Sequence, residues 1–264
     1  MAIHIIYDLD AFSHSIKDGR SPLADPAFFD VAVLAYASFA FLEELAPLRR
    51  AEPDLYRAIR KYYISATCPR LILPGNEIAR RESVAGRPLS RRECLLGEDD
   101  YFGAINLLLD DDLDILSDEV RDRKNRYAAD MAESLARLLE DPSVKEMGNS
   151  ERKDTFAGVF SDRESSLQSR AESIYGRTDI DYGTLPHVRF FLDYFEAKKY
   201  QAHVSNRKFR RGELYDVSYL VEAVTLGNLV TDDKDLRDTA GLIVDGGEIR
   251  VFDLRRFLES HRKT

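Results

Sequence analysis

The sequence predicts an α/β fold in which helices flank a parallel central sheet and an all-helical insertion interrupts the sheet domain. Short apolar runs that stop at polar or turn residues occur at 3–7, 71–73, 229–230 and 249–252, as is typical of strands buried on both faces of a sheet. Segments of helical composition separate these runs, and strands that alternate with helices form parallel sheets. From 97 to 182 the pattern is helical without strand signals. We therefore expect a sheet domain made of 1–96 and 183–264, with a helical insertion at 97–182.

Helices are expected where apolar residues recur at helical spacing or where a capping residue opens such a stretch. Ala, Leu and Phe dominate the first predicted helix, at 27–45, and Pro47 follows its end. Asn76 is the expected N-cap of a helix that runs through Glu82, and Asp216 opens a later helix. The other predicted helical ranges are 54–63, 128–139, 186–200, 235–240 and 254–258.

Composition and charge restrict the class of protein. The 264 residues are 44% hydrophobic and 32% charged, which suits a globular domain with a sizeable core. The sequence contains no uninterrupted apolar stretch long enough to span a membrane and no secretory signal. The only cysteines, Cys68 and Cys94, favour a reducing compartment without disulfides. We expect a cytoplasmic protein, and the net charge of −9 argues against broad, nonspecific binding to nucleic acid.

Four acidic residues stand where a parallel sheet would gather them. Asp8 ends the first strand, Glu82 lies on the helix after the second, Asp216 opens a long helix, and Asp233 follows the strand at 229–230. Ligands bind in the crevice outside the carboxyl ends of such strands. Carboxylates that converge there repel one another unless a cation joins them. Mg²⁺ or Mn²⁺ fits such oxygen ligands and activates water for attack on phosphate, so the pattern predicts metal-assisted phosphodiester hydrolysis.

The same segments resemble the PIN-domain family of nucleases. The resemblance lies in the strand that ends in Asp8, the strand–Pro–helix–Glu segment at 71–82, the Asp216-led helix, and the closing strands and helices at 230–236 and 249–258. It covers roughly the first hundred and the last seventy-five residues. The resemblance implies a PIN-like fold and a Mg²⁺- or Mn²⁺-dependent nuclease that acts on RNA rather than DNA. It also implies that Asp8, Glu82, Asp216 and Asp233 are both the catalytic and the metal-binding residues.

Other acidic residues compete for these positions or add to them. Asp10 stands where the family has Asn, and Glu77 competes with Glu82 for the middle acid. The further candidate metal ligands are Glu213, Asp232 and Asp235.

Basic residues near the acidic positions are the expected contacts to the substrate strand. They are Arg80 and Arg81 beside Glu82, and Arg207, Lys208, Arg210 and Arg211 ahead of Asp216. The expected partner is a nucleic acid, RNA more than DNA, and no association with a membrane is expected. The insertion is the expected surface for a homodimer or a protein partner.

Two other functions stay open at the level of sequence. Asp8-Leu9-Asp10 would suit a haloacid-dehalogenase-like phosphatase, with Asp8 as nucleophile and Asp10 as general acid. Phe12 and the lack of a convincing Lys motif argue against that class. The second alternative is a catalytically inactive PIN-like scaffold. The five histidines show no zinc-ligand spacing.

Overall fold

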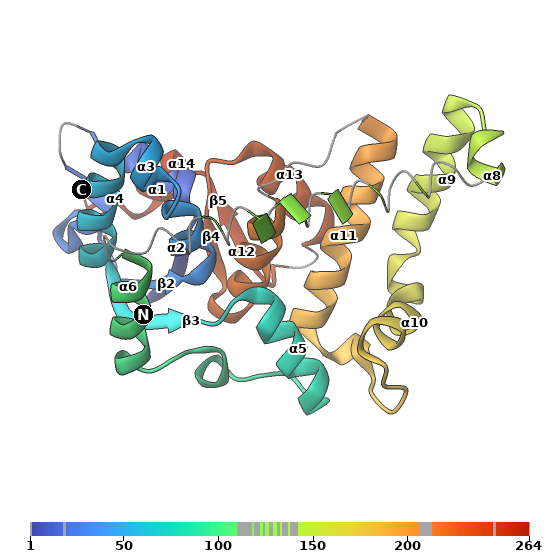
Figure 1. Ribbon diagram of the computed structural model, residues 1–264, viewed down its shortest axis with the longest axis horizontal. Helices are drawn as coiled ribbons and strands as arrows, with labels where there is room; N and C mark the ends of the chain where they lie inside the picture. The colour runs from blue at the N-terminus through green and yellow to red at the C-terminus, as the bar shows by residue number, and fades with distance from the viewer. Residues whose placement is uncertain are drawn as a thin grey trace.

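Five short parallel strands form one sheet, which lies in the left half of the view in Figure 1. This computed structural model describes residues 2–17, 20–109, 142–205, 213–244 and 247–263, together with scattered positions between 118 and 137. The sheet has the order β3-β2-β1-β4-β5, and each neighbouring pair is parallel. The predicted α/β fold with a parallel central sheet and flanking helices is therefore confirmed. The strands are β1 (Ile3–Tyr7), β2 (Val33–Ser38), β3 (Thr67–Ile72), β4 (Asn228–Val230) and β5 (Arg250–Phe252).

The strand order reverses between β1 and β4. From β1 the chain moves outward to β2 and β3, and after the long helical segment it returns to β4 on the other side of β1. Ile6 pairs with Leu229 and Tyr7 with Val230 across this point. In doubly wound sheets a crevice opens at such a reversal, beyond the carboxyl ends of the strands. Asp8 and Thr231 are the residues that follow β1 and β4 there.

Helices surround the sheet, and the central one is α12 (Glu213–Leu226), which packs against β1, β4, α5 and α11. None of its described residues is exposed, and its buried residues include the polar Glu213, Ser218 and Glu222 besides apolar ones. The other helices are α1 (Leu9–Ser15), α2 (Phe39–Leu45), α3 (Leu48–Ala51), α4 (Pro53–Ala66), α5 (Gly75–Ala85), α6 (Glu98–Leu109), α8 (Pro142–Lys145), α9 (Asn149–Ser161), α10 (Arg163–Tyr175), α11 (Pro186–Ser205), α13 (Lys234–Ile243) and α14 (Leu254–His261). Short 3₁₀ turns lie at Pro22–Ala24 (η1), Pro26–Phe28 (η2), Arg91–Cys94 (η3) and Tyr182–Thr184 (η4). None of the helices in the described part of the chain combines the length and apolarity needed to cross a bilayer.

The helix predicted over 27–45 is wrong for most of its length. The structure has η2 at its start, then β2, and only then α2. Ala35, Tyr36 and Ala37 are buried within the strand, so the run lacks the polar positions that a half-buried strand would show. Ser38 ends the strand and caps α2, because its hydroxyl accepts from the Phe41 amide. The sheet therefore has a strand beside β1 in a segment whose composition predicted a helix.

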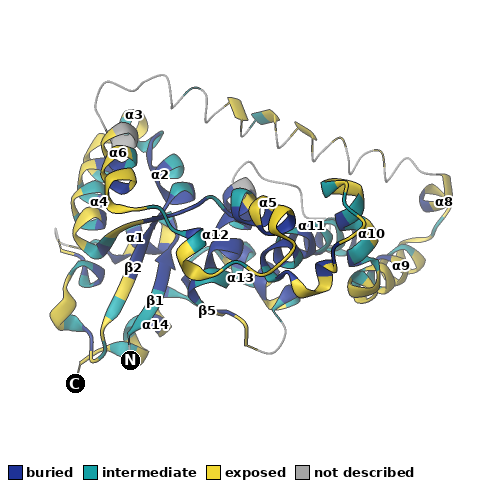
Figure 2. Ribbon diagram, turned by 90° about the horizontal axis from the view of Figure 1, so that it is seen from below, coloured by how far each residue is buried: buried dark blue, intermediate teal, exposed yellow. Residues whose placement is uncertain are grey.

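The described residues of 97–182 form no strand, but they do not stand apart from the sheet domain. Tyr101 and Ile105 of α6 belong to the main core. Farther along, α11 stands between the sheet with its helices and the α9–α10 pair (Figures 1 and 2). A second apolar cluster joins α5, α10, η4 and α11; its buried members are Ala79, Leu167, Ala171, Ile180, Tyr182, Leu185, Val188 and Leu192.

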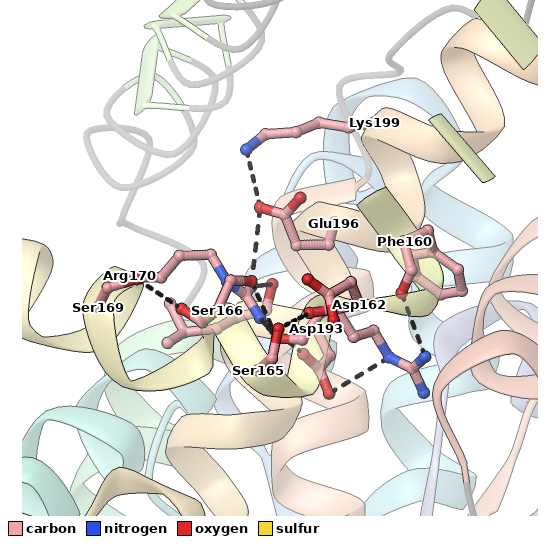
Figure 3. A network of polar contacts seen from close by, with 11 residues as sticks. Phe160, Asp162, Ser165, Ser166, Ser169, Arg170, Asp193, Glu196 and Lys199 are labelled. Carbon is pink, nitrogen blue, oxygen red and sulfur yellow. Dashed lines mark hydrogen bonds and ion pairs between the residues drawn. The ribbon is translucent and has the colours of Figure 1, made fainter. Parts of the chain in front are cut away.

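Polar contacts add to the attachment of α10 to α11 (Figure 3). Arg170 Nη2 lies 3.3 Å from Asp193 Oδ1, and Arg163 Nε lies 3.7 Å from Asp193 Oδ2. Arg170 Nη1 also lies 3.7 Å from Glu196 Oε1. Burial raises the pKa of Asp193, and the two arginines oppose that rise. A buried carboxylate between two cations holds these helices in one arrangement.

Candidate carboxylate site

Asp8 is fixed at the carboxyl end of β1 by hydrogen bonds to both of its side-chain oxygens. Its backbone N–H donates to the Val230 carbonyl at 3.0 Å, which extends the β1–β4 pairing by one residue. Asp8 Oδ1 accepts from the Ala11 amide at 2.7 Å, so the side chain caps α1. Oδ2 accepts from the Thr231 hydroxyl. The residue is only 4% exposed, so the carboxyl is buried with its orientation set.

Thr231 connects the ends of β1 and β4. Besides donating to Asp8, its hydroxyl accepts from the Asp233 amide at 3.0 Å. Asp233 in turn caps α13, because its Oδ1 accepts from the Leu236 amide at 3.0 Å. The turn after β4 therefore brings Asp233 beside Asp8 and points both side chains toward helix N-termini, where negative charge is stabilised.

Asp216 reaches the same place from the first turn of α12. Lys198, a buried residue of α11, lies 3.9 Å from Asp216 Oδ2 and 3.4 Å from Glu213 Oε1. The Tyr194 hydroxyl also lies 3.4 Å from Asp216 Oδ2. The Lys198 ammonium thus partly offsets the negative charge gathered around Asp216.

Glu44 is an acidic residue at the site that the sequence pattern did not reveal. It lies in the last turn of α2, which directly follows β2, and its Oε2 accepts from the Tyr219 hydroxyl at 2.9 Å. Its charge acts on both Asp8 and Asp216. The available signal was an uncharged run at 31–42, long enough for a strand and the start of a helix, that is followed at once by Glu43 and Glu44. Interpreting 27–45 as one helix concealed it.

We call Asp8, Asp10, Glu44, Asp216 and Asp233 the acid cluster. The charges of Asp10 and Glu44 raise the pKa of Asp8, those of Asp233 and Glu44 raise the pKa of Asp216, and that of Asp233 raises the pKa of Asp10. Burial is the largest cause of the raised pKa of Asp8 and of Asp216. The Thr231 and Ala11 hydrogen bonds oppose it at Asp8, and Lys198 opposes it at Asp216. Carboxyl groups whose pKa is perturbed by both burial and charged neighbours are typical of functional sites.

Glu82 lies elsewhere, although it is fully buried. Its Oε1 accepts from His187 Nδ1 at 2.8 Å, and its Oε2 accepts from the Val188 amide at 3.0 Å. His187 Nε2 continues the chain to the Thr225 hydroxyl at 2.9 Å. These partners satisfy the Glu82 carboxylate at the start of α11, so the structure does not bring it together with Asp8, Asp216 and Asp233.

Glu77 does not join the acid cluster either. Its carboxylate binds Arg80 and Arg81 at 2.8 Å each, and these two arginines lower the pKa of Glu77 to about 2. Both arginines predicted to contact substrate on α5 are thus engaged by a neighbour on their own helix. The other predicted substrate contacts, Arg207, Lys208, Arg210 and Arg211, lie outside the described residues.

The remaining candidate ligands are Asp10, which belongs to the acid cluster, and Asp232, Asp235 and Glu213, each of which lies within three residues of a cluster member in the chain. Partial burial and the charges of Asp233 and Asp232 raise the pKa of Asp10. Asp232 accepts from the Leu254 amide and lies 2.9 Å from His14 Nδ1. Asp235 stands in the first turn of α13. Glu213 shares the Lys198 ammonium with Asp216, and its charge raises the pKa of Asp216.

The donor set fits a hard divalent cation in chemical type, since every member offers carboxylate oxygens. The spacing is wider than a ligand shell: among the described residues, no three His, Cys, Asp or Glu side chains lie close enough together to hold a metal ion. A cation at this site would therefore require the carboxylates to draw closer. Comparison with family models, curated proteins and solved structures found no match to this chain.

Proposed function

We propose that this chain is a Mg²⁺- or Mn²⁺-dependent nuclease that hydrolyses phosphodiester bonds in RNA. The observation that supports the proposal is the position of the acid cluster. Asp8, Glu44, Asp216 and Asp233 come from four different elements, interact electrostatically, and stand where the strand order reverses. The preference for RNA rests on the resemblance of the sequence to PIN-domain nucleases.

In this proposal Asp8, Glu44, Asp216 and Asp233 would hold the cation. A bound divalent ion supplies activation of water and charge neutralisation at the phosphate. The Thr231 hydroxyl orients Asp8 through one of its oxygens, and the Ala11 amide fixes the other. Lys198 favours the charged form of Asp216, which is the form that binds a cation.

The phosphatase alternative has little support from the surroundings of Asp8. Both of its carboxylate oxygens accept hydrogen bonds, and the side chain is buried. A nucleophilic carboxylate needs an oxygen open to attack a phosphorus atom. Each Asp8 oxygen keeps a lone pair that a cation could share, but a whole phosphoryl group would have to reach a side chain that is only 4% exposed.

A non-catalytic scaffold is a second candidate, favoured by one observation. The described acidic side chains do not form a ready-made metal shell, and Lys198 already pairs with Asp216 and Glu213. In a scaffold the ammonium would be the permanent counter-charge of these two acids. Divalent cations would then leave the stability of the protein unchanged.

Cleavage of a labelled single-stranded RNA with Mn²⁺ tests the proposal. We expect wild-type cleavage to be lost in Asp8→Asn and in Asp216→Asn, while Asp179→Asn, an exposed residue paired with Arg177, cleaves like the wild type. Melting temperatures establish that the variants fold. Mn²⁺ should raise the melting temperature of the wild type and of Asp179→Asn only. Cleavage that persists in both acid-cluster variants would refute the assignment.

A matched pair of variants decides which glutamate belongs to the site. Glu44→Gln should abolish cleavage with little change in stability, because the glutamine oxygen can still accept from the Tyr219 hydroxyl. Glu82→Gln should keep cleavage but lose on the order of 1–3 kcal/mol of stability, since its side-chain amide cannot accept every bond that the carboxylate accepts. The reverse outcome would restore Glu82 as the middle acid.

A further inference from the structure

A groove of about 660 Å³ begins at the edge of the acid cluster. Asp232, which follows the carboxyl end of β4, and His14, in the last turn of α1, both line it. Asp232 is the neighbour of Asp233 in the chain, and its charge acts on Asp10. Asp232 Oδ1 also accepts from the Leu254 amide at 2.9 Å, which fixes the start of α14 along the groove. A molecule lying in the groove would therefore end beside the acid cluster.

The lining of the groove is largely apolar and includes an aromatic ring. Phe28 of η2 lines it together with Leu254 and Leu258 of α14. The ring of Phe28 is half-buried and packs edge-on against Phe29 at a centroid distance of 5.4 Å. The Arg262 guanidinium lies over this ring, 5.9 Å from its centroid. A half-exposed aromatic ring beside an arginine is the kind of surface on which unpaired bases stack.

The groove is more basic than the chain as a whole. Lys17, Arg255 and Arg262 outnumber the carboxylates of Asp232 and Glu259 along it, although the chain carries a net charge of −9. Arg255 pairs with Glu259 at 2.7 Å, so Lys17 and Arg262 are the cations best placed to meet an anion. This local excess of positive charge favours binding of an anionic group in the groove, whereas the negative charge of the acid cluster repels one.

We propose that this groove binds the unpaired nucleotide adjacent to the phosphodiester bond that the acid cluster cleaves. The base would lie against Phe28, and Lys17 and Arg262 would contact its phosphate. The inference rests on the proposed nuclease function and makes it specific for single-stranded substrate, because a base must be unstacked from its helix to reach an aromatic side chain. The volume lies within the range of small-ligand sites.

Steady-state kinetics on two substrates test the groove separately from the chemistry. Phe28→Leu combined with Lys17→Gln should raise KM for a single-stranded oligoribonucleotide by roughly 5- to 150-fold, the range expected for one lost base stack. The value of kcat, and the hydrolysis of methyl 4-nitrophenyl phosphate, should stay unchanged. Phe102→Leu is the matched control, since Phe102 is an exposed aromatic residue on α6. An unchanged KM in the groove variant would overturn the inference.

Direct binding keeps the two proposals distinguishable. A fluorescently labelled single-stranded oligoribonucleotide, kept uncleaved by EDTA, which removes the divalent cation, should bind the wild type and lose affinity in the groove variant by the same factor. If the wild type cleaves neither substrate but this difference in binding persists, the nuclease proposal fails and the groove assignment stands. If dodecanoate binds in place of the oligonucleotide and Phe28→Leu weakens that binding instead, the nucleotide assignment is overturned.

Discussion

Glu222 shows at the scale of one residue how strongly this fold perturbs a carboxyl group. It lies on α12 with Asp216 and is fully buried. Burial raises its pKa to about 8, although the hydroxyls of Ser38 and Ser218 oppose the rise by hydrogen bonding. The Glu43 charge acts in the same direction as burial. Near neutral pH the folded protein therefore keeps a proton on Glu222 that the unfolded chain has released.

This difference predicts a pH-dependent stability. Between the ordinary glutamate pKa of 4.5 and the raised value of about 8, the folded state binds more protons, so Glu222 lowers the free energy of unfolding as the pH rises, by at most about 1.4 kcal/mol per pH unit. Glu222→Gln should remove this slope and be more stable than the wild type near pH 8. Urea unfolding across the pH range measures it. Parallel wild-type and variant curves would contradict the assignment.

Glu77 is the control of opposite sign. Arg80 and Arg81 lower its pKa to about 2, so its contribution is present above pH 4.5 and is lost as the pH falls toward 2. Glu77→Gln should therefore change the acid limb of the stability curve and leave the neutral limb as it is.

The sequence was a good guide to acidic residues at the boundaries of elements and a poor one for those inside helices. Asp8, Asp216 and Asp233 each stand at the end of a strand or the start of a helix, where chain topology fixes their position. Glu82 and Glu44 both lie inside a helix, and only tertiary packing decides which of them comes near Asp8. Glu82 accepts a hydrogen bond from His187. Glu44, in contrast, lies on α2 where its charge acts on Asp8. Neither arrangement follows from local spacing.

At the scale of elements, the close contact between α5 and α12 is set by Gly75. A Cβ atom at this position would lie 2.8 Å from the Cα and carbonyl oxygen of Ser218, closer than unbonded atoms can come. The Gly75 amide also donates to the Ser218 hydroxyl at 2.8 Å. The N-terminus of α5 therefore rests directly on α12, two residues along the chain from Asp216.

Gly75→Ala should destabilise the protein by about 1–3 kcal/mol, because the backbone of α12 must shift to relieve the clash. Gly103→Ala is the matched control: it also lies within a helix, but no atom of the described residues stands within 4 Å of the point that its methyl group would occupy. That substitution should stabilise by about 0.5–1 kcal/mol through helix propensity. Urea unfolding compares the two, and equal effects would show that α5 does not rest on α12 in this way.

Local patterns predicted most elements but not all of their limits. The strands at 3–7, 229–230 and 249–252 and the helices predicted at 54–63 and 186–200 were recognisable from apolar runs and helical composition. The strand β2 was not recognisable, because its local, alanine-containing sequence favours a helix. Its burial between β1 and β3 overrides that preference. Long-range pairing supplied the information that composition lacked.

At the scale of the whole molecule, the helical segment and the sheet share contacts that should make them unfold together. Asp193 of α11 binds Arg163 and Arg170 of α10, and the apolar cluster around Tyr182 extends the same contact. Asp193→Ala leaves two arginines without their buried partner and should cost about 3–5 kcal/mol. Far-UV circular dichroism and tyrosine fluorescence should report one urea transition in both proteins. Two separate transitions would show that 97–182 folds independently.

The central claim is that the acid cluster binds a divalent cation at the β1–β4 reversal. Crystals soaked in Mn²⁺ test it most directly, through anomalous difference density. We predict one strong peak among the carboxylates of Asp8, Glu44, Asp216 and Asp233, which disappears in Asp8→Asn. A map without that peak, or with manganese at Glu77 or Glu82 instead, would contradict the claim.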